Sequence, residues 1–255
     1  MSGPGHAAGV GRLVEEPGGG GRVSLVSPKL RALGVPHGFT TRRGVGSGGV
    51  GDPGVASAAD LAGFLADAGL AGAAAFLGRQ VHGVRVSRPG DRDTPADAHF
   101  GGPGGGVVAV RTADCLAVLL VGPAGVVAAH AGWRGLLAGV LEASVDALGG
   151  TDRVEAVAIG PAIGAEAFEI GPEVAAAFRA AGHPNRVHPG RGDRSHVDLL
   201  GVALDRLGAA GVPRARVDAA GRCTHAEPDR FFSYRRDGPG RGHQAAWIRP
   251  PRRRA

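Results

Sequence analysis

The chain has 255 residues, of which 43% are hydrophobic and only 4% are aromatic, so we expect a core built mainly from Val, Leu and Ala. Its formal net charge of +6 comes largely from Arg249, Arg252, Arg253 and Arg254, which argues against a nucleic-acid partner for the rest of the chain. No apolar run approaches the length of a membrane span, no secretory leader is visible, and two cysteines are too few for a disulfide framework. We therefore expect a cytoplasmic protein with reduced thiols and no membrane contact.

The distribution of glycine and charge divides the chain into three segments. Residues 1–22 are rich in glycine and predict a disordered N-terminus, residues 23–249 are expected to form a single domain, and residues 250–255 a solvated basic tail. Within the domain, short apolar runs and helical patterns alternate irregularly, without an internal repeat or a boundary. This alternation is typical of the α+β class, with helices and sheets stacked as the layers of a sandwich.

The first part of the domain predicts an edge strand, a second strand that runs into a glycine-rich loop, and one helix. Ser57 is the expected N-cap of that helix. The predicted elements are a strand at 23–26, a strand from residue 35 that leads into the loop 44–54, a helix at 58–68, a strand at 76–87 that passes through His82, and a loop at 88–105 that contains Asp97 and His99.

Three short apolar runs, at 107–110, 116–121 and 126–129, form the centre of the sequence. Runs this short, rich in Val and Leu and broken by Gly and Pro, predict buried strands, which we expect to be neighbours in one sheet. A Gly-Pro turn separates the second run from the third. Cys115 then begins one strand and His130 ends the next, so a hairpin places both residues near the same edge of the sheet.

The last part of the sequence alternates helices and strands. The predicted elements are a helix that opens at 132–135 and runs to residue 148, a strand at 154–159, a helix at 172–181, a basic loop at 183–195, a helix at 197–210, a short strand at 214–217 and a final strand at 244–248.

His82, Cys115 and His130 are the strongest candidates for chemistry. Two imidazoles and a thiolate are ligands that zinc accepts, and three protein ligands leave a fourth position for water, as in catalytic zinc sites. The same residues fit a metal-free cysteine nucleophile with His82 or His130 as its base. Inert burial of Cys115 and a non-catalytic binding module are the remaining alternatives. The residue types and their spacing leave all of these open.

Several arginines lie at predicted turns, among them Arg42, Arg134 and Arg235. Arginine binds phosphate or carboxylate through a planar fork of donors, so each is a candidate anion contact. Arg134 is the strongest of the three because it follows His130 by four residues.

Six short motifs together resemble the laccase-domain purine nucleoside phosphorylase family, once described as multicopper polyphenol oxidases. The resemblance extends over about residues 35–248, keeps the family's order, and places the family's metal ligands on His82, Cys115 and His130. It implies an α/β/β/α sandwich. The motifs are Thr41-Arg42-Arg43-Gly44, Gln80-Val81-His82-Gly83, Thr112-Ala113-Asp114-Cys115, Ala129-His130-Ala131-Gly132-Trp133-Arg134-Gly135, Ile159-Gly160-Pro161 and residues 231–237.

The resemblance further implies a zinc enzyme with one zinc per chain, in which the metal ligands are also the catalytic residues. Its substrates are purine nucleosides (adenosine, inosine, guanosine and S-methyl-5′-thioadenosine) with inorganic phosphate, and the same site deaminates adenosine. Arg42, Arg134 and Arg235 are then the candidates for binding phosphate, and Asp114 for contacting the substrate or protonating the purine. Copper is less expected, because a single group of three ligands cannot hold the several coppers that oxygen reduction requires.

The chain departs from the family's pattern at a few positions. Gly44-Val45-Gly46-Ser47 stands where the family usually has Gly-Gly-Val-Ser, and the Asn-Leu-Gly segment that commonly follows is missing or degraded. Ala117 replaces a usual proline, and His99 stands in a strand that is usually apolar. The first departure alters one wall of the expected pocket, and none of them touches the three ligands.

Overall fold

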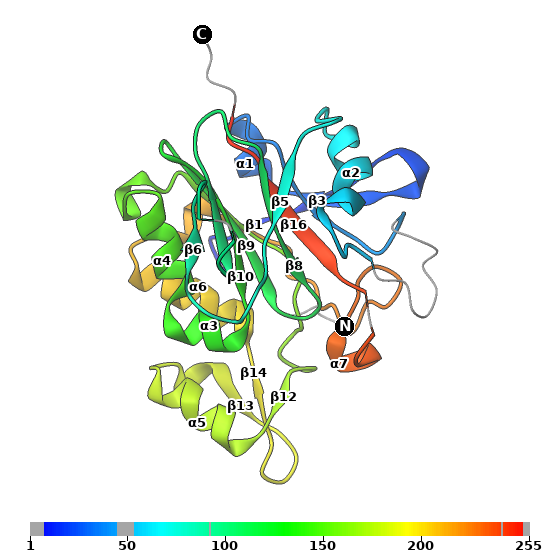
Figure 1. Cartoon of the computed structure of the whole chain (residues 1–255). Helices are drawn as coiled ribbons and strands as arrows, with labels where there is room; N and C mark the ends of the chain where they lie inside the picture. Colours follow the sequence, from blue (N-terminus) through cyan, green and yellow to red (C-terminus); the bar gives the residue numbers. More distant parts are fainter. Residues whose placement is uncertain (1–7, 45–53, 92, 241, 252–255) are drawn as a thin grey trace.

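A computed structural model describes residues 8–44, 54–91, 93–240 and 242–251, and in it two sheets pack face to face with helices on their outer sides (Figure 1). The first sheet has seven strands in the order β1-β15-β11-β9-β10-β7-β6. Its strands are β1 (Gly11–Arg12), β6 (Val86–Ser87), β7 (Ala98–Gly101), β9 (Leu116–Gly122), β10 (Gly125–Ala131), β11 (Ala156–Ile159) and β15 (Val217–Ala219).

The second sheet has six strands in the order β2-β3-β4-β16-β8-β5. They are β2 (Val14–Pro17), β3 (Val23–Val26), β4 (His37–Thr40), β5 (Ala75–Leu77), β8 (Val107–Thr112) and β16 (Gln244–Ile248). A small sheet extends from one end of the sandwich beside α5 (Figure 1). It consists of β12 (Glu169–Ile170), β14 (Ser195–Val197) and β13 (Val187–Pro189).

Apolar clusters fill the spaces between four layers. Leu119 of β9 and Val110 of β8 belong to the cluster between the sheets. A second cluster joins the outer face of the first sheet to α3 (Trp133–Ala138), α4 (Val140–Ala147), α5 (Pro172–Ala180) and α6 (Leu199–Ala209). A third places Phe64 of α2 (Ala62–Asp67) on the outer face of the second sheet, against Trp247. The predicted α/β/β/α sandwich in a single domain is therefore confirmed.

The hairpin of β9 and β10 forms as the Gly-Pro turn predicts, with Gly122 paired to Gly125. The three central runs do not share one sheet, however. β8 lies in the second sheet, and the chain crosses to the first sheet at residues 113–115. All seven residues of β9 and all seven of β10 are buried, because both faces of their sheet are covered. A strand that is apolar on both faces carries no pattern that tells to which sheet it belongs.

Between residues 76 and 105, two other expectations are wrong. The strand predicted at 76–87 is broken: β5 ends at Leu77, β6 begins at Val86, and His82 lies in the loop between them. The loop predicted at 88–105 contains β7, which carries His99. β7 is stabilised by pairing with β10, and this long-range partner is not visible in a segment rich in Pro, Gly and Asp.

The disorder predicted for residues 1–22 is wrong for the part that the structure describes. β1 pairs with β15, and β2 pairs with β3, so β3 is not the edge strand that was expected. Backbone hydrogen bonds to neighbouring strands order this glycine-rich segment despite its composition. The tail at 250–255 and the altered loop at 44–47 lie mostly outside the described residues.

The remaining elements differ from the predictions mainly at their ends. Gly139, with φ +108°, divides the helix expected to run to residue 148 into α3 and α4. The basic loop at 183–195 includes β13, and the strand expected at 214–217 begins instead at Val217. Within the described residues, no helix is long and apolar enough to cross a membrane.

Candidate metal centre

His82, Cys115 and His130 converge at one end of the sandwich, where the chain crosses between the two sheets. Their ligand atoms all lie within 4.8 Å of one another. Cys115 Sγ is 4.0 Å from His82 Nε2, and the two imidazole rings are nearly perpendicular, with centroids 4.8 Å apart. His82 is exposed, Cys115 is half-buried and His130 is buried, so one side of the group is open to solvent. The structure thus brings together the three residues predicted from sequence.

A buried carboxylate orients the most buried of the three. His130 Nδ1 donates a hydrogen bond to Asp97 Oδ1 at 2.7 Å, and the side chains of these residues are 3% and 0% exposed. This bond places the ring proton on Nδ1 and leaves Nε2 as the nitrogen that is available for a metal.

The loop that carries His82 is fixed by the same carboxylate. The backbone N–H groups of Val81, His82 and Gly83 donate to Asp97 at 3.1, 2.8 and 2.7 Å. His82 has a φ of +60°, a left-handed conformation that costs energy for a residue with a side chain. Hydrogen bonds to all three successive N–H groups hold the loop in this conformation.

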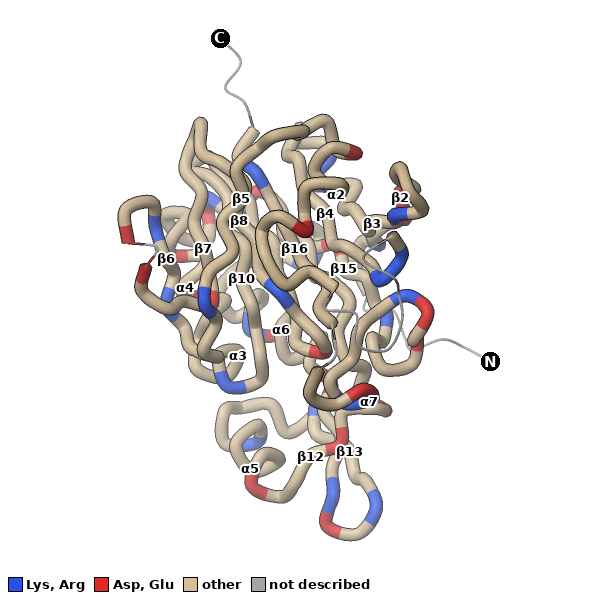
Figure 2. The backbone as a smooth tube through the Cα atoms, turned by 45° about the vertical axis from the view of Figure 1, so that its right-hand side comes forward, with Lys and Arg blue, Asp and Glu red and all other residues tan. Residues whose placement is uncertain are grey.

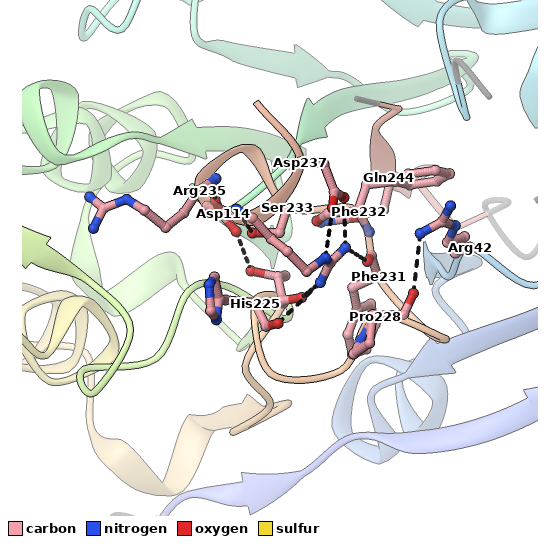
Figure 3. Close-up of polar contacts among 12 residues, drawn as sticks. Arg42, Asp114, His225, Pro228, Phe231, Phe232, Ser233, Arg235, Asp237 and Gln244 are labelled. Carbon is pink, nitrogen blue, oxygen red and sulfur yellow. Dashed lines mark hydrogen bonds and ion pairs between the residues drawn. The ribbon is translucent and has the colours of Figure 1, made fainter. Parts of the chain in front are cut away.

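The turn that carries Cys115 is strained in a similar way. Asp114 has a φ of +89°, and it and His82 are the only non-glycine residues with positive φ in the described part of the chain. Asp114 Oδ1 accepts from Thr224 Oγ1 at 2.6 Å, and Oδ2 accepts from the Arg235 N–H at 2.7 Å (Figure 3). Both oxygens therefore anchor the Cys115 turn to the segment around α7 (Tyr234–Asp237). Both Asp114 oxygens thus accept hydrogen bonds from protein donors, and its contact with a substrate stays a prediction.

Gly132, the N-cap of α3, and Gly135, within α3, allow this helix to approach the His82 loop closely. A Cβ at Gly132 would lie 2.5 Å from His82 Cδ2 and 3.3 Å from Cys115 Sγ, and one at Gly135 would lie 2.6 Å from the carbonyl oxygen of Gly83. A larger residue at Gly132 has to displace the His82 ring, and one at Gly135 has to displace the backbone of the His82 loop.

The charges of the group reinforce one another. Burial raises the pKa of the Cys115 thiol, but hydrogen bonds and positive charge from His130 and His82 outweigh burial and lower this pKa to about 6. Burial lowers the pKa of His130, whereas its hydrogen bonds to Asp97 and Cys115 raise it to about 9. Burial also raises the pKa of Asp97, but its hydrogen bonds from His130 and the loop bring it below the ordinary value. Both shifts favour a thiolate on Cys115 and a protonated His130 beside the Asp97 carboxylate when no metal is bound.

The three arginines predicted to bind phosphate do not form one cluster. Arg134 is exposed on α3 and stacks on Trp133 at 4.5 Å. Arg235 donates to the carbonyl oxygens of Ala167 and Glu169, at 3.3 and 2.8 Å. Arg42 donates to the Pro228 carbonyl at 3.3 Å, and Figure 3 places it at the opposite end of the α7 region from Arg235.

In the described part of the chain, positive and negative side chains are mixed along the backbone. Lys and Arg are interspersed with Asp and Glu along the described chain, as Figure 2 shows. Many are paired, as in the Arg186–Asp205 bridge at 2.7 Å.

The donor set fits a single metal ion. Two imidazole nitrogens and a thiolate suit zinc, and the carboxylate–histidine pair is the outer shell that orients metal-bound histidines. Within the described residues, this is the one group of three or more His, Cys, Asp or Glu side chains close enough to share an ion. One such group cannot hold several coppers.

Asp97 is the residue that the sequence interpretation missed. It lies in a loop, as expected, at the residue immediately before β7. The only sequence signal for Asp97 is an acidic residue directly before a strand. Its partners are His82, in the preceding loop, and His130, on β10, and only the fold brings the three together.

The described residues thus form a four-layer, single-domain sandwich in which a His₂Cys group that could hold a metal ion lies at the crossover between the two sheets. The chain belongs to the family described as multi-copper polyphenol oxidoreductase laccase, whose sequence profile matches residues 31–250. The match includes His82, Cys115 and His130.

Relatives in this family carry names drawn from nucleoside chemistry. The purine nucleoside phosphorylase PA4543 of Pseudomonas aeruginosa is 44% identical over 179 residues, which cover 66% of this chain and 72% of that protein. A Deinococcus radiodurans purine nucleoside phosphorylase is 40% identical over 256 residues, covering 89% and 94%. Adenosine deaminase RL5, from an unknown prokaryotic organism, is 40% identical over 153 residues, covering 56% and 57%. The crystal structure of Neisseria meningitidis protein NMB0706 superimposes with a TM-score of 0.72 at 30% identity, covering 94% and 99%.

Proposed function

We propose that this chain is a zinc-dependent purine nucleoside phosphorylase that also deaminates adenosine. Its substrates are adenosine, inosine, guanosine and S-methyl-5′-thioadenosine, together with inorganic phosphate. The convergence of His82, Cys115 and His130 within 4.8 Å carries the proposal, and the names of the relatives support the substrate class. The proposed location is the cytoplasm, where free thiols such as Cys115 and Cys223 stay reduced.

His82, Cys115 and His130 would hold one zinc ion per chain. When bound, zinc supplies a Lewis acid and a means of activating water at neutral pH. The thiolate form of Cys115, which its two imidazole neighbours favour, is the form that binds metal. Asp97 keeps the proton of His130 on Nδ1, so that the other ring nitrogen can be a ligand.

Phosphorolysis also needs a binding site for phosphate close to the reacting nucleoside. Arg134 is the best placed of the predicted arginines, because it follows Trp133 at the start of α3, directly beyond the Gly132 that contacts His82 and Cys115. Its guanidinium is exposed and stacked on Trp133, which orients the planar donor fork without occupying its N–H groups. Arg42 and Arg235 remain weaker candidates, because each already donates to backbone carbonyls.

An activity screen tests this proposal. Purified protein of measured zinc content is incubated with each of the four nucleosides, with and without phosphate, and the release of free base and of ammonia is followed. We expect phosphate-dependent base release from at least one nucleoside and ammonia from adenosine. Zinc-loaded protein that produces neither contradicts the proposal.

A second candidate, a metal-free cysteine hydrolase or amidase, is favoured by one specific feature. Cys115, His130 and Asp97 have the order of a nucleophile, a base and an orienting carboxylate, and the Cys115 pKa is lowered to about 6. Substitution of Cys115 by His or Asp separates the two candidates, because a nucleophile needs sulfur whereas a ligand needs a lone pair. Residual zinc binding and turnover in either variant support the zinc enzyme. Full activity of metal-free wild type, with a covalent adduct on Cys115, supports the hydrolase.

A further inference from the structure

We propose that Asp97 is the positioning residue of the metal centre, and that its single carboxylate sets both histidine ligands against Cys115. This inference rests on the proposed metal-binding function. Asp97 itself would not be a ligand, because both of its oxygens accept hydrogen bonds from protein donors.

The two oxygens of Asp97 accept different hydrogen bonds. Oδ1 accepts from His130 Nδ1 at 2.7 Å and from the His82 N–H at 2.8 Å, and thus joins the two histidines directly. Oδ2 accepts from Val81 and Gly83 at 3.1 and 2.7 Å, and thus fixes the residues on either side of His82. One rigid group therefore determines the distance between two ligands that lie 48 positions apart in the sequence.

The position of Asp97 is in turn determined by the first sheet. Its backbone carbonyl accepts the His130 N–H at 2.6 Å, and the next residue, Ala98, pairs with Ala129 of β10. The carboxylate and the His130 ring thus come from adjacent strands in fixed register. The His82 loop, which has no strand of its own, is joined to that pair by the three N–H groups that donate to Asp97.

Other contacts locate the loop without orienting the ligands. Gln80 exchanges hydrogen bonds with the backbone of Arg111 at 2.8 and 2.9 Å, and Gly83 lies against Gly135. These contacts hold both ends of the loop, so a variant at Asp97 is expected to keep the loop near its place while the imidazoles lose their alignment.

Asp97→Asn is the informative change, because it keeps the size and removes one acceptor. An amide NH₂ facing His130 can only donate, so Nδ1 has to accept and the ring proton moves to Nε2, the nitrogen needed by the metal. An NH₂ turned the other way opposes the N–H groups of Val81 and Gly83. Either orientation weakens the centre, and we expect a loss of about 10–100-fold in metal affinity.

A matched control is available in Asp218→Asn. The Asp218 side chain is 1% exposed and accepts from Ser27 Oγ at 2.6 Å, Lys29 N at 3.0 Å and Lys29 Nζ at 2.7 Å. It is therefore a similarly buried and similarly bonded carboxylate that has no contact with the three ligands. Its variant measures the general cost of losing such a group.

The experiment compares cobalt(II) and zinc binding in the full-length wild type, Asp97→Asn and Asp218→Asn, with thermal melts as the check of folding. We expect weakened binding and an altered cobalt visible spectrum for Asp97→Asn alone, together with a fall in kcat. Wild-type affinity and spectrum in Asp97→Asn overturn the positioning role, whatever its activity. Failure of wild type itself to bind either metal contradicts the proposed function instead.

A measurement on the wild type covers the case in which Asp97→Asn does not fold. Long-range proton–nitrogen NMR of the zinc-loaded protein reports which ring nitrogen of His130 carries the proton. The structure assigns the proton to Nδ1, facing Asp97. A proton on Nε2 overturns the proposal.

Discussion

Asp97 and Asp218 are both buried aspartates of the first sheet region, yet they organise different kinds of structure. Asp218 accepts hydrogen bonds from Ser27 and Lys29, which begin α1 (Pro28–Ala32), and the Lys29 ammonium neutralises its charge. Ser27 Oγ also accepts the Leu30 N–H as the N-cap of α1, so the donors around Asp218 are used to fix the start of a helix. Asp97 instead accepts from His130, whose second ring nitrogen is left for another partner. It also accepts from the loop that carries His82, whose ring lies beside the Cys115 thiol. The two carboxylates are equally buried, but only Asp97 binds residues whose side chains keep a free ligand atom for a metal.

The largest expected difference between the two regions is their response to metal removal. Elemental analysis of protein purified without added metal is expected to find about one zinc per chain, as the His₂Cys donor set suggests. Chelation should abolish turnover and added zinc should restore it, while the α1 cap keeps its structure as followed by circular dichroism. Several copper atoms per chain would contradict the single-zinc centre.

Next in size is the effect of crowding the metal centre. Gly132→Ala places a methyl group 2.5 Å from His82 Cδ2, so we expect about tenfold or greater loss of zinc affinity and a destabilisation of about 1–3 kcal/mol. Urea unfolding and zinc titration measure the two effects. Gly208→Ala in α6 is the control, because a Cβ there meets nothing within 4 Å and should stabilise the helix by about 0.5–1 kcal/mol. Unchanged zinc affinity in Gly132→Ala means that the close approach is not needed.

A smaller and more selective effect is expected at Arg134. Arg134→Ala should lower phosphate-dependent kcat/KM by about 10–100-fold, corresponding to about 1.5–3 kcal/mol for a charge-assisted contact. Zinc content should remain that of the wild type, because Arg134 stacks on Trp133 and is not a ligand. Arg179→Ala, at an exposed arginine on α5, is the matched control and should leave both quantities unchanged. Loss of zinc from Arg134→Ala would make the residue structural.

The smallest effect concerns the acid sensitivity of the α1 cap region. His37 Nε2 accepts the Ser27 N–H at 2.7 Å, Nδ1 bonds the Val35 carbonyl at 2.8 Å, and burial lowers the pKa of His37 below 6.5. Because the unfolded chain binds this proton more readily, the contribution of His37 to stability is complete above that value and decreases as the pH falls below it. His37→Gln keeps an acceptor but cannot titrate. The difference in Tm between wild type and this variant should change between about pH 7.5 and pH 5; a constant difference contradicts the assignment.

The local sequence determined those parts of the site that depend on contacts between near neighbours. The β9–β10 hairpin follows from two apolar runs on either side of a Gly-Pro turn, and it places Cys115 and His130 at the same end of a sheet. The helix after His130 begins at Trp133, as expected, and the final strand at 244–248 matches β16. The ligand types alone left a metal centre and a cysteine nucleophile open, and the motifs were needed to favour zinc and nucleosides. The hairpin, the start of the helix and the final strand each depend on residues within a few positions of one another.

Only the tertiary structure decided which sheet each strand joins and how the ligands are aligned. β8 is buried except at Arg111 and β9 is buried throughout, so an apolar run stands on each side of the crossover at residues 113–115. β1 and β7 have weak local patterns and are ordered by their partners β15 and β10. The left-handed conformations of His82 and Asp114 persist because Asp97, Thr224 and Arg235 supply hydrogen bonds from distant parts of the chain. Long-range hydrogen bonds have no signature in the spacing of residues, and for that reason the carboxylate that aligns the metal centre emerged only from the fold.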